Sequence, residues 1–78
     1  MGLFDRFKKK ADPDVQAQID ELSSDDPRRR EAAARKLGEM GAHAAVALPA
    51  LEVAIADEDG DVCLAASDSL SKIRKDVH

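Results

Sequence analysis

The sequence has few of the residues that stabilise or activate small proteins by covalent or metal chemistry. Its one cysteine, Cys63, excludes an internal disulfide and fits a reducing compartment. Two histidines and one thiol do not make a structural zinc set, so no metal and no cofactor are expected. Tyrosine and tryptophan are absent, so a core must be built from aliphatic side chains, which suits closely packed helices. At 78 residues the chain is expected to form one small domain.

Positive charge and long apolar runs are also scarce. The net charge of −4 argues against a nucleic-acid partner, because such a partner selects a basic face. No segment approaches the roughly 18 consecutive apolar residues of a membrane-spanning helix. The first residues also lack the apolar stretch of a signal peptide. We therefore expect a cytoplasmic protein.

Helix signals occur four times, whereas the apolar–polar alternation of strands does not occur. Asp12 and Asp26 are predicted N-caps, each followed by a proline at the first helical position. Gly41 is the predicted stop of the second helix, and Pro49 must lie in the first turn of the third. The fourth helix is expected to start near Asp59. The predicted inward stripes are Val15, Ile19 and Leu22; Ala33, Leu37 and Met40; Leu48, Leu51 and Ile55; and Val62, Ala65, Ala66, Leu70 and Ile73.

The second half of the chain repeats the first at a constant offset. The shift that aligns Asp26 with Asp59 also aligns Leu37 with Leu70. A period of this size is typical of repeat proteins built from helix pairs. One helix pair cannot bury its own apolar face, and a second pair stacked beside it covers that face.

The stretches "DDPRRREAAARKLGEMG" and "LPALEVAIADEDGDVCLAASDSLSKI" resemble HEAT repeats, of the type also found in phycobilin lyases. The resemblance covers Pro13 to Arg74. It implies an all-α fold, a short α–α superhelix (solenoid) of two helix pairs. The implied divisions are a tail or cap (1–11) and a repeat domain (12–78) with repeats at 12–41 and 45–75. In this family an arginine commonly pairs with an aspartate of the neighbouring turn, which implies that Arg30 reaches Asp59 or Asp61.

Members of this family are mostly scaffolds that bind proteins, so the resemblance implies a non-catalytic interaction module or adaptor. The second helix of each pair usually lines the concave side, which here means 27–40 and 60–74. The residues expected to contact a protein partner are Arg28, Glu31, Arg35, Asp68, Ser71 and Lys72. An alternative, by analogy with the lyase branch, is an accessory to the maturation of a cofactor-bearing protein.

The N-terminal segment "LFDRFKKK" combines an apolar face with basic residues. Leu3, Phe4 and Phe7 share one helical face, and Lys8 to Lys10 follow it. We expect this segment to be a lid over the exposed end of the first helix pair, or a tail. The alternatives are a peripheral membrane contact, of which this combination is typical, and a docking segment for a partner.

Two repeats are fewer than the roughly three that usually give independent stability. We therefore expect a cover over the open ends, either the N-terminal segment or a second copy of the chain. A homodimer is expected to bury the outer faces of Leu51, Ile55, Ile73 or Val77.

Three further motifs favour structural roles. The turn "DEDGD" fails as a calcium loop, because Val62 stands where the loop needs glycine, and is better explained by N-capping aspartates. The cluster Arg28 to Arg30 is expected to form ion pairs with acidic neighbours. Cys63 is predicted to be a buried inert thiol and His43 an exposed loop residue.

Overall fold

The computed structural model describes residues 13–77, and the predictions for Leu3, Phe4, Phe7 and the Asp12 cap lie outside this range. The described residues form an all-helical fold without strands, which confirms the predicted class. The elements are α2 (Pro13–Glu21), α3 (Pro27–Met40), the 3₁₀ helix η1 (Gly41–Ala47), α4 (Leu48–Ala54) and α5 (Gly60–Asp76). Within this part of the chain, no helix is both long and apolar enough to cross a bilayer.

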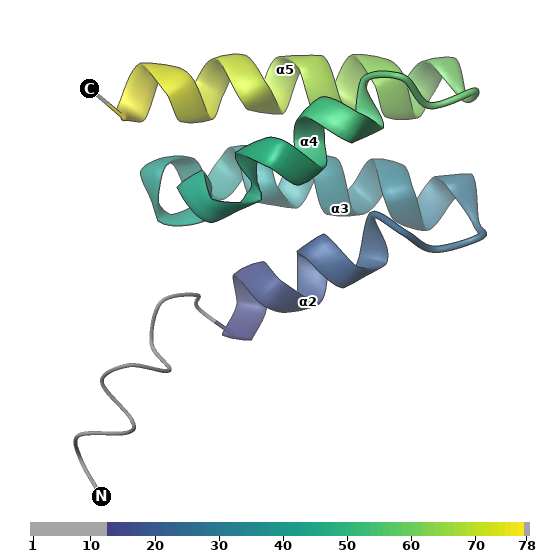
Figure 1. Cartoon of the computed structure of the whole chain (residues 1–78), viewed down its shortest axis with the longest axis horizontal. Helices are drawn as coiled ribbons and strands as arrows, with labels where there is room; N and C mark the ends of the chain where they lie inside the picture. Colours follow the sequence, from purple (N-terminus) through teal and green to yellow (C-terminus); the bar gives the residue numbers. More distant parts are fainter. Residues whose placement is uncertain (1–12, 78) are drawn as a thin grey trace, which may run out of the picture.

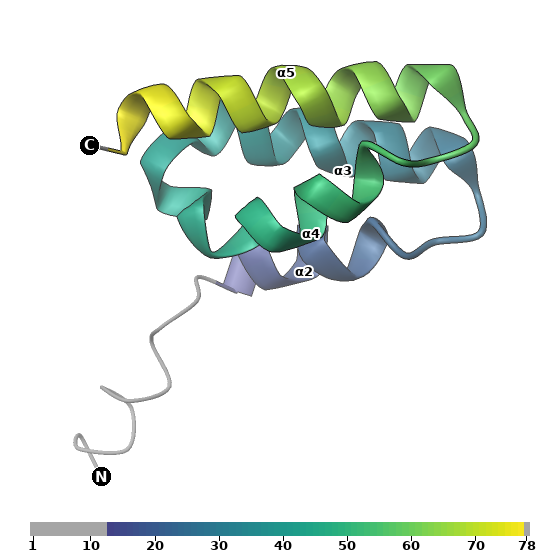
Figure 2. The ribbon, with the colours of Figure 1, turned by 45° about the horizontal axis from the view of Figure 1, so that its top comes forward.

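The helices are arranged in two layers. Helices α3 and α5 lie side by side and run in the same direction, while α2 and α4 run the opposite way (Figure 1). Seen from the second direction, α2 and α4 lie on one side of the α3–α5 layer (Figure 2). Each of α3 and α5 thus forms an antiparallel pair with the helix that precedes it in the sequence.

The two turns that lead into α3 and α5 share two hydrogen bonds. Asp26 and Asp59 are both N-caps with extended backbone, and each Oδ1 accepts at 2.9 Å from the backbone N–H two residues later. The backbone N–H of Asp26 donates to Ser24 Oγ, and the backbone N–H of Asp59 donates to Asp57 Oδ1 in the same way. The offset that aligns Asp26 with Asp59 therefore relates turns of equal local geometry. The predicted caps at these two residues are confirmed.

The third predicted helix is divided by its proline. Because Pro49 has no N–H, the Ala45 carbonyl cannot receive the usual α-helical bond from it. The Leu48 N–H donates to Ala45 instead, in the tighter pattern of a 3₁₀ helix. Pro49 itself lies in the first turn of α4, as predicted. The sequence pattern did not indicate the 3₁₀ segment.

The core contains most of the predicted apolar stripes. Val15, Leu37, Leu51, Val62 and Ile73 are fully buried. Leu22 and Met40 are half-buried against the same cluster. The residues of the α5 stripe are all buried, as predicted: Val62, Ala65, Ala66, Leu70 and Ile73.

The prediction for Ile55 is wrong, since its side chain is 38% exposed. Helix α4 ends at Ala54, which is buried, and Ile55 lies in the turn that follows. The segment η1 is also interrupted at Ala44, whose φ of −100° and ψ of 20° are not helical, so an α-helical count of inward positions does not continue through it. Ala44 and Ala47 face the core.

Small residues allow α3 and α5 to approach closely. Ser69 is buried, and its hydroxyl donates to the Ala34 carbonyl across the interface. A Cβ added at Gly38 would overlap with the Ser69 side chain and lie 3.0 Å from Ser69 Cα. Gly41, with φ +62°, ends α3 in a conformation that favours glycine, which confirms the predicted stop.

The expected dimer contacts need correction. Leu51 and Ile73 are fully buried inside the chain, so they have no outer face to offer a second copy. Ile55 and Val77 are exposed, as that interface requires. The exposed apolar residues that the sequence analysis did not select include Val53 (76% exposed) and Leu64 (70% exposed).

Candidate binding groove between α3 and α5

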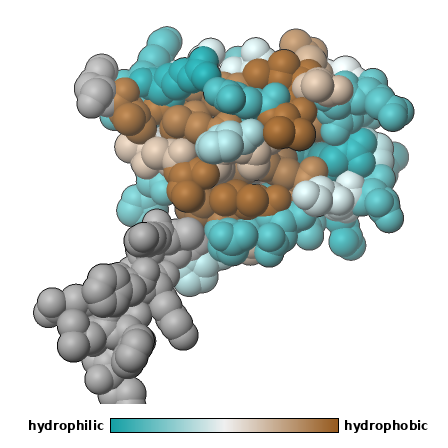
Figure 3. All heavy atoms as spheres, viewed as in Figure 1, coloured by the Kyte–Doolittle hydropathy of each residue, from teal (hydrophilic) through white to brown (hydrophobic). Residues whose placement is uncertain are grey.

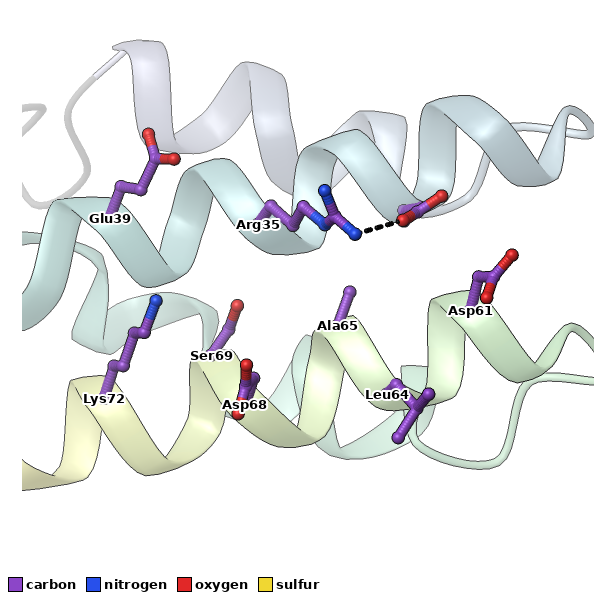
Figure 4. A pocket seen from close by; sticks show the side chains of 9 residues that line it. Arg35, Glu39, Asp61, Leu64, Ala65, Asp68, Ser69 and Lys72 are labelled. Carbon is purple, nitrogen blue, oxygen red and sulfur yellow. Dashed lines mark ion pairs between the residues drawn. The ribbon is translucent and has the colours of Figure 1, made fainter.

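A polar groove of about 340 Å³ runs between α3 and α5 on the outer side of their layer (Figure 4). Two small residues of its lining, Ala65 and Ser69, point from α5 toward α3. The α3 wall consists of Glu31, Arg35 and Glu39, and the rest of the lining is Asp61, Leu64, Ala65, Asp68, Ser69 and Lys72.

Charges of both signs line this groove. On α3, Arg35 forms an ion pair with Glu31, with Nη2 and Oε2 2.7 Å apart. Figure 4 shows the Lys72 side chain rising from α5 toward α3, with Asp61 near the other end of the groove. The Arg35 side chain is 69% exposed, and an exposed pair at this helical spacing contributes only about 0.3–0.5 kcal/mol. An incoming charged group can therefore replace it at low cost.

Four of the six predicted partner-binding residues lie together in the groove: Glu31, Arg35, Asp68 and Lys72. The other two, Arg28 and Ser71, are exposed on the same helices but do not line it. Three further residues of the groove were not among the predicted contacts: Glu39, Asp61 and Leu64. Their spacing was a usable signal, because Glu39 follows Arg35 by four positions and Leu64 precedes Asp68 by four.

A second polar cluster joins the two interhelix turns through Arg30. Its Nη1 donates to the Ser24 carbonyl at 2.8 Å, and its Nη2 donates to Asp57 Oδ1 at 3.2 Å. Arg30 Nε also lies 2.8 Å from Asp57 Oδ2, which is an ion-pair distance without the direction of a hydrogen bond. The prediction that Arg30 reaches Asp59 or Asp61 is wrong, because its partner is Asp57. The Asp59 carboxylate is engaged by the N–H groups of Asp61 and Val62 instead.

The environment of Asp57 favours its ionised form. The backbone N–H of Asp59 donates to the carboxylate and lowers the pKa of Asp57 below the ordinary 3.8, and Arg30 lowers this pKa further. Desolvation by burial opposes the shift without reversing it. Asp57 is thus a charged structural residue of the turn.

The remaining candidate groups have structural positions. Cys63 is a free, half-buried thiol on α5 rather than a fully buried one. His43 is exposed, as predicted, but belongs to η1 rather than to a loop. The turn "DEDGD" contains the α5 cap Asp59. Within residues 13–77, no group of three or more His, Cys, Asp and Glu side chains could hold a metal ion.

In comparisons with known proteins, no family model, no curated protein and no solved structure matches this chain. The resemblance to HEAT repeats therefore stays a prediction from the sequence motifs.

Proposed function

We propose that the chain is a non-catalytic, cytoplasmic protein-interaction module that binds a partner protein in the α3–α5 groove. The observation that carries this proposal is the gathering of Glu31, Arg35, Asp68 and Lys72 around one groove. The resemblance to HEAT repeats implies these four residues as partner contacts. Their side chains come from two helices that are distant in sequence and adjacent in space (Figure 4).

The groove's charge order suggests the chemistry of the partner. Asp61 and Asp68 favour basic side chains on the bound segment, and Lys72 favours an acidic one. Leu64 offers an apolar contact beside them, since its side chain is 70% exposed. A peptide or helix with mixed charges and one apolar anchor matches this arrangement.

The arrangement of the helices also favours a scaffold role. Two antiparallel helix pairs stacked in the same direction are the minimal unit of a helical repeat protein, and such proteins use their extended surfaces to bind partners. We propose that the alignment of the two halves of the chain reflects two HEAT-like repeats of this kind. The hydrogen bond that each of Asp26 and Asp59 accepts from the backbone N–H two residues later supports this interpretation.

Affinity capture from host lysate with a charge-swapped groove tests the proposal. The variant Asp68→Lys/Lys72→Glu reverses two groove charges and keeps the net charge. The control Lys36→Glu/Glu58→Lys makes the same exchange at exposed positions outside the groove. We expect a partner that is retained by the wild type and the control and lost by the groove variant. Equal retention by all three proteins would exclude this groove as the binding surface.

A further inference from the structure

A second groove, on the opposite layer, is apolar. It lies between α2 and α4, has a volume of about 270 Å³, and is lined mainly by Ile19, Leu22, Ala50, Val53 and Ala54. Figure 3 shows hydrophobic residues gathered over this face, with hydrophilic residues around them. Val53 is 76% exposed, which is unusual for a valine on a folded domain.

The layer that carries this apolar groove is acidic. The range 13–26 contains five carboxylates and the range 42–59 contains four, and neither range contains lysine or arginine. Two of these carboxylates have arginine partners from the other layer, since Asp57 pairs with Arg30 and Glu52 pairs with Arg74. The remaining acids, including Asp20, Glu21 and Glu58, give this layer a negative field that attracts basic groups.

The first ten residues of the same chain have the complementary composition. Phe4 and Phe7 are the only aromatic residues of the protein, and Leu3 adds a third large apolar side chain. Four cations, Arg6 and Lys8 to Lys10, stand beside them against the single Asp5. The segment therefore combines apolar and basic residues, whereas the α2–α4 layer combines an apolar groove with an excess of acidic residues.

The chain is long enough to connect the two. Phe7 precedes Pro13 by six residues, which span up to about 20 Å when extended. Along α2, Ile19 and Leu22 lie only about 9–14 Å from Pro13, at 1.5 Å per residue. The segment can thus turn back at the start of α2 and reach the groove beside it.

We propose that residues 3–10 dock in the α2–α4 groove of their own chain. In this arrangement Phe4 and Phe7 cover Val53, and the lysines face the acidic residues of the α2–α4 layer. The occupant is this N-terminal segment rather than a separate partner. This site is on the other layer from the α3–α5 groove, so it does not depend on the proposed function.

Tryptophan fluorescence tests the proposal, because the chain has no tryptophan of its own. In full-length Phe7→Trp, we expect emission that is blue-shifted relative to the same tryptophan in a free 1–12 peptide, together with slower quenching by acrylamide. Adding Val53→Lys should abolish the shift, whereas Leu64→Lys, the same kind of change at a similarly exposed site on α5, should keep it. Replacement of Lys8 to Lys10 by glutamate should also abolish the shift while leaving residues 13–77 unchanged. Salt at about 1 M should weaken it, since the Debye length falls to about 3 Å.

Each other result would overturn the proposal. An unshifted emission in the parent variant means that the segment does not dock. Loss of the shift in both lysine variants means that the α2–α4 groove is not the site. A shift that grows with concentration alongside a doubled mass assigns the groove to a second copy. A shift that appears only with phosphatidylserine vesicles assigns the segment to a membrane surface.

Discussion

Arg30 and Asp57 connect the two interhelix turns of the protein, with Arg30 Nε 2.8 Å from Asp57 Oδ2. The same guanidinium also donates to the carbonyls of Ser24 and Asp25 in the first turn. One side chain thus ties the start of α3 to the end of the α4 segment. In the alignment of the two halves, the equivalent of Arg30 is Cys63, which cannot extend the contact to a further turn.

Replacement of Arg30 should destabilise the protein more than replacement of its exposed neighbour. Arg30→Met removes donors to three oxygen atoms, and hydrogen bonds to charged groups contribute about 1.5–3 kcal/mol each, so a loss on this order is expected. Arg30→Lys should recover only part of it, because an ammonium group cannot reproduce the planar fork. Urea unfolding of these variants measures the loss. Arg29→Met is the matched control and should change stability by less than about 0.5 kcal/mol; an equal loss in both would contradict the role of Arg30.

The contribution of Asp57 should depend on pH. The Asp59 N–H, and then Arg30, hold the pKa of Asp57 below 3.8 in the folded chain. The ionised carboxylate therefore stabilises the fold above pH 3.8, and this stabilisation is lost as the pH falls through the folded pKa. Asp57→Asn keeps an oxygen acceptor but removes the charge. The difference in Tm between wild type and Asp57→Asn should be large at about pH 6 and shrink toward about pH 2, and a difference that is constant with pH would contradict the prediction.

The helices could be predicted because their signals are local. These signals are the aspartate caps, the prolines at first helical positions and the apolar stripes that include Leu37 and Ile73. Each of them depends only on residues that are close in sequence. The 3₁₀ segment could not be predicted, because the alanine-rich run before Pro49 has no periodic contrast. The prediction that Ile55 faces inward was wrong for the same reason, because the residues of α4 that face the core depend on how that segment leads into the helix.

The candidate site was predicted in part. Helical spacing brought Glu31 and Arg35 to one face of α3, and Asp68 and Lys72 to one face of α5. The depth of the groove depends on the close approach at Gly38 and Ser69, which is a contact between distant residues. The partner of Arg30 was misassigned because the sequence does not reveal that Asp59 is engaged by backbone N–H groups.

The two cap aspartates should differ in their contribution to stability. Asp26 accepts from one backbone N–H, that of Arg28, whereas Asp59 accepts from two, those of Asp61 and Val62. Replacement of a cap by alanine typically costs about 1 kcal/mol, with a range of about 0.5–2. We expect Asp59→Ala to cost more than Asp26→Ala in chemical denaturation. The reverse order would contradict the assignment of hydrogen bonds in the two turns.

Gly38→Ala should disrupt the contact between α3 and α5. The added Cβ overlaps with Ser69, and overpacking of this kind costs about 1–3 kcal/mol. Ser69→Gly in the same chain should recover part of the loss, which a double-mutant cycle measures. Gly60→Ala is the matched control, because a Cβ there meets nothing within 4 Å. If Gly38→Ala and Gly60→Ala behave alike, the close approach of the helices is wrong.

Site-specific photo-crosslinking in the host cell tests whether a partner protein binds in the α3–α5 groove. Benzoylphenylalanine at Leu64 places the probe in the α3–α5 groove, and the same residue at Val46 places it at an exposed apolar position outside the groove lining. If the partner binds there, we expect a discrete partner adduct from position 64 and none from position 46. The adduct from position 64 should disappear with Asp68→Lys/Lys72→Glu. Adducts of equal yield from both positions, or an adduct from position 46 alone, would contradict binding in the α3–α5 groove.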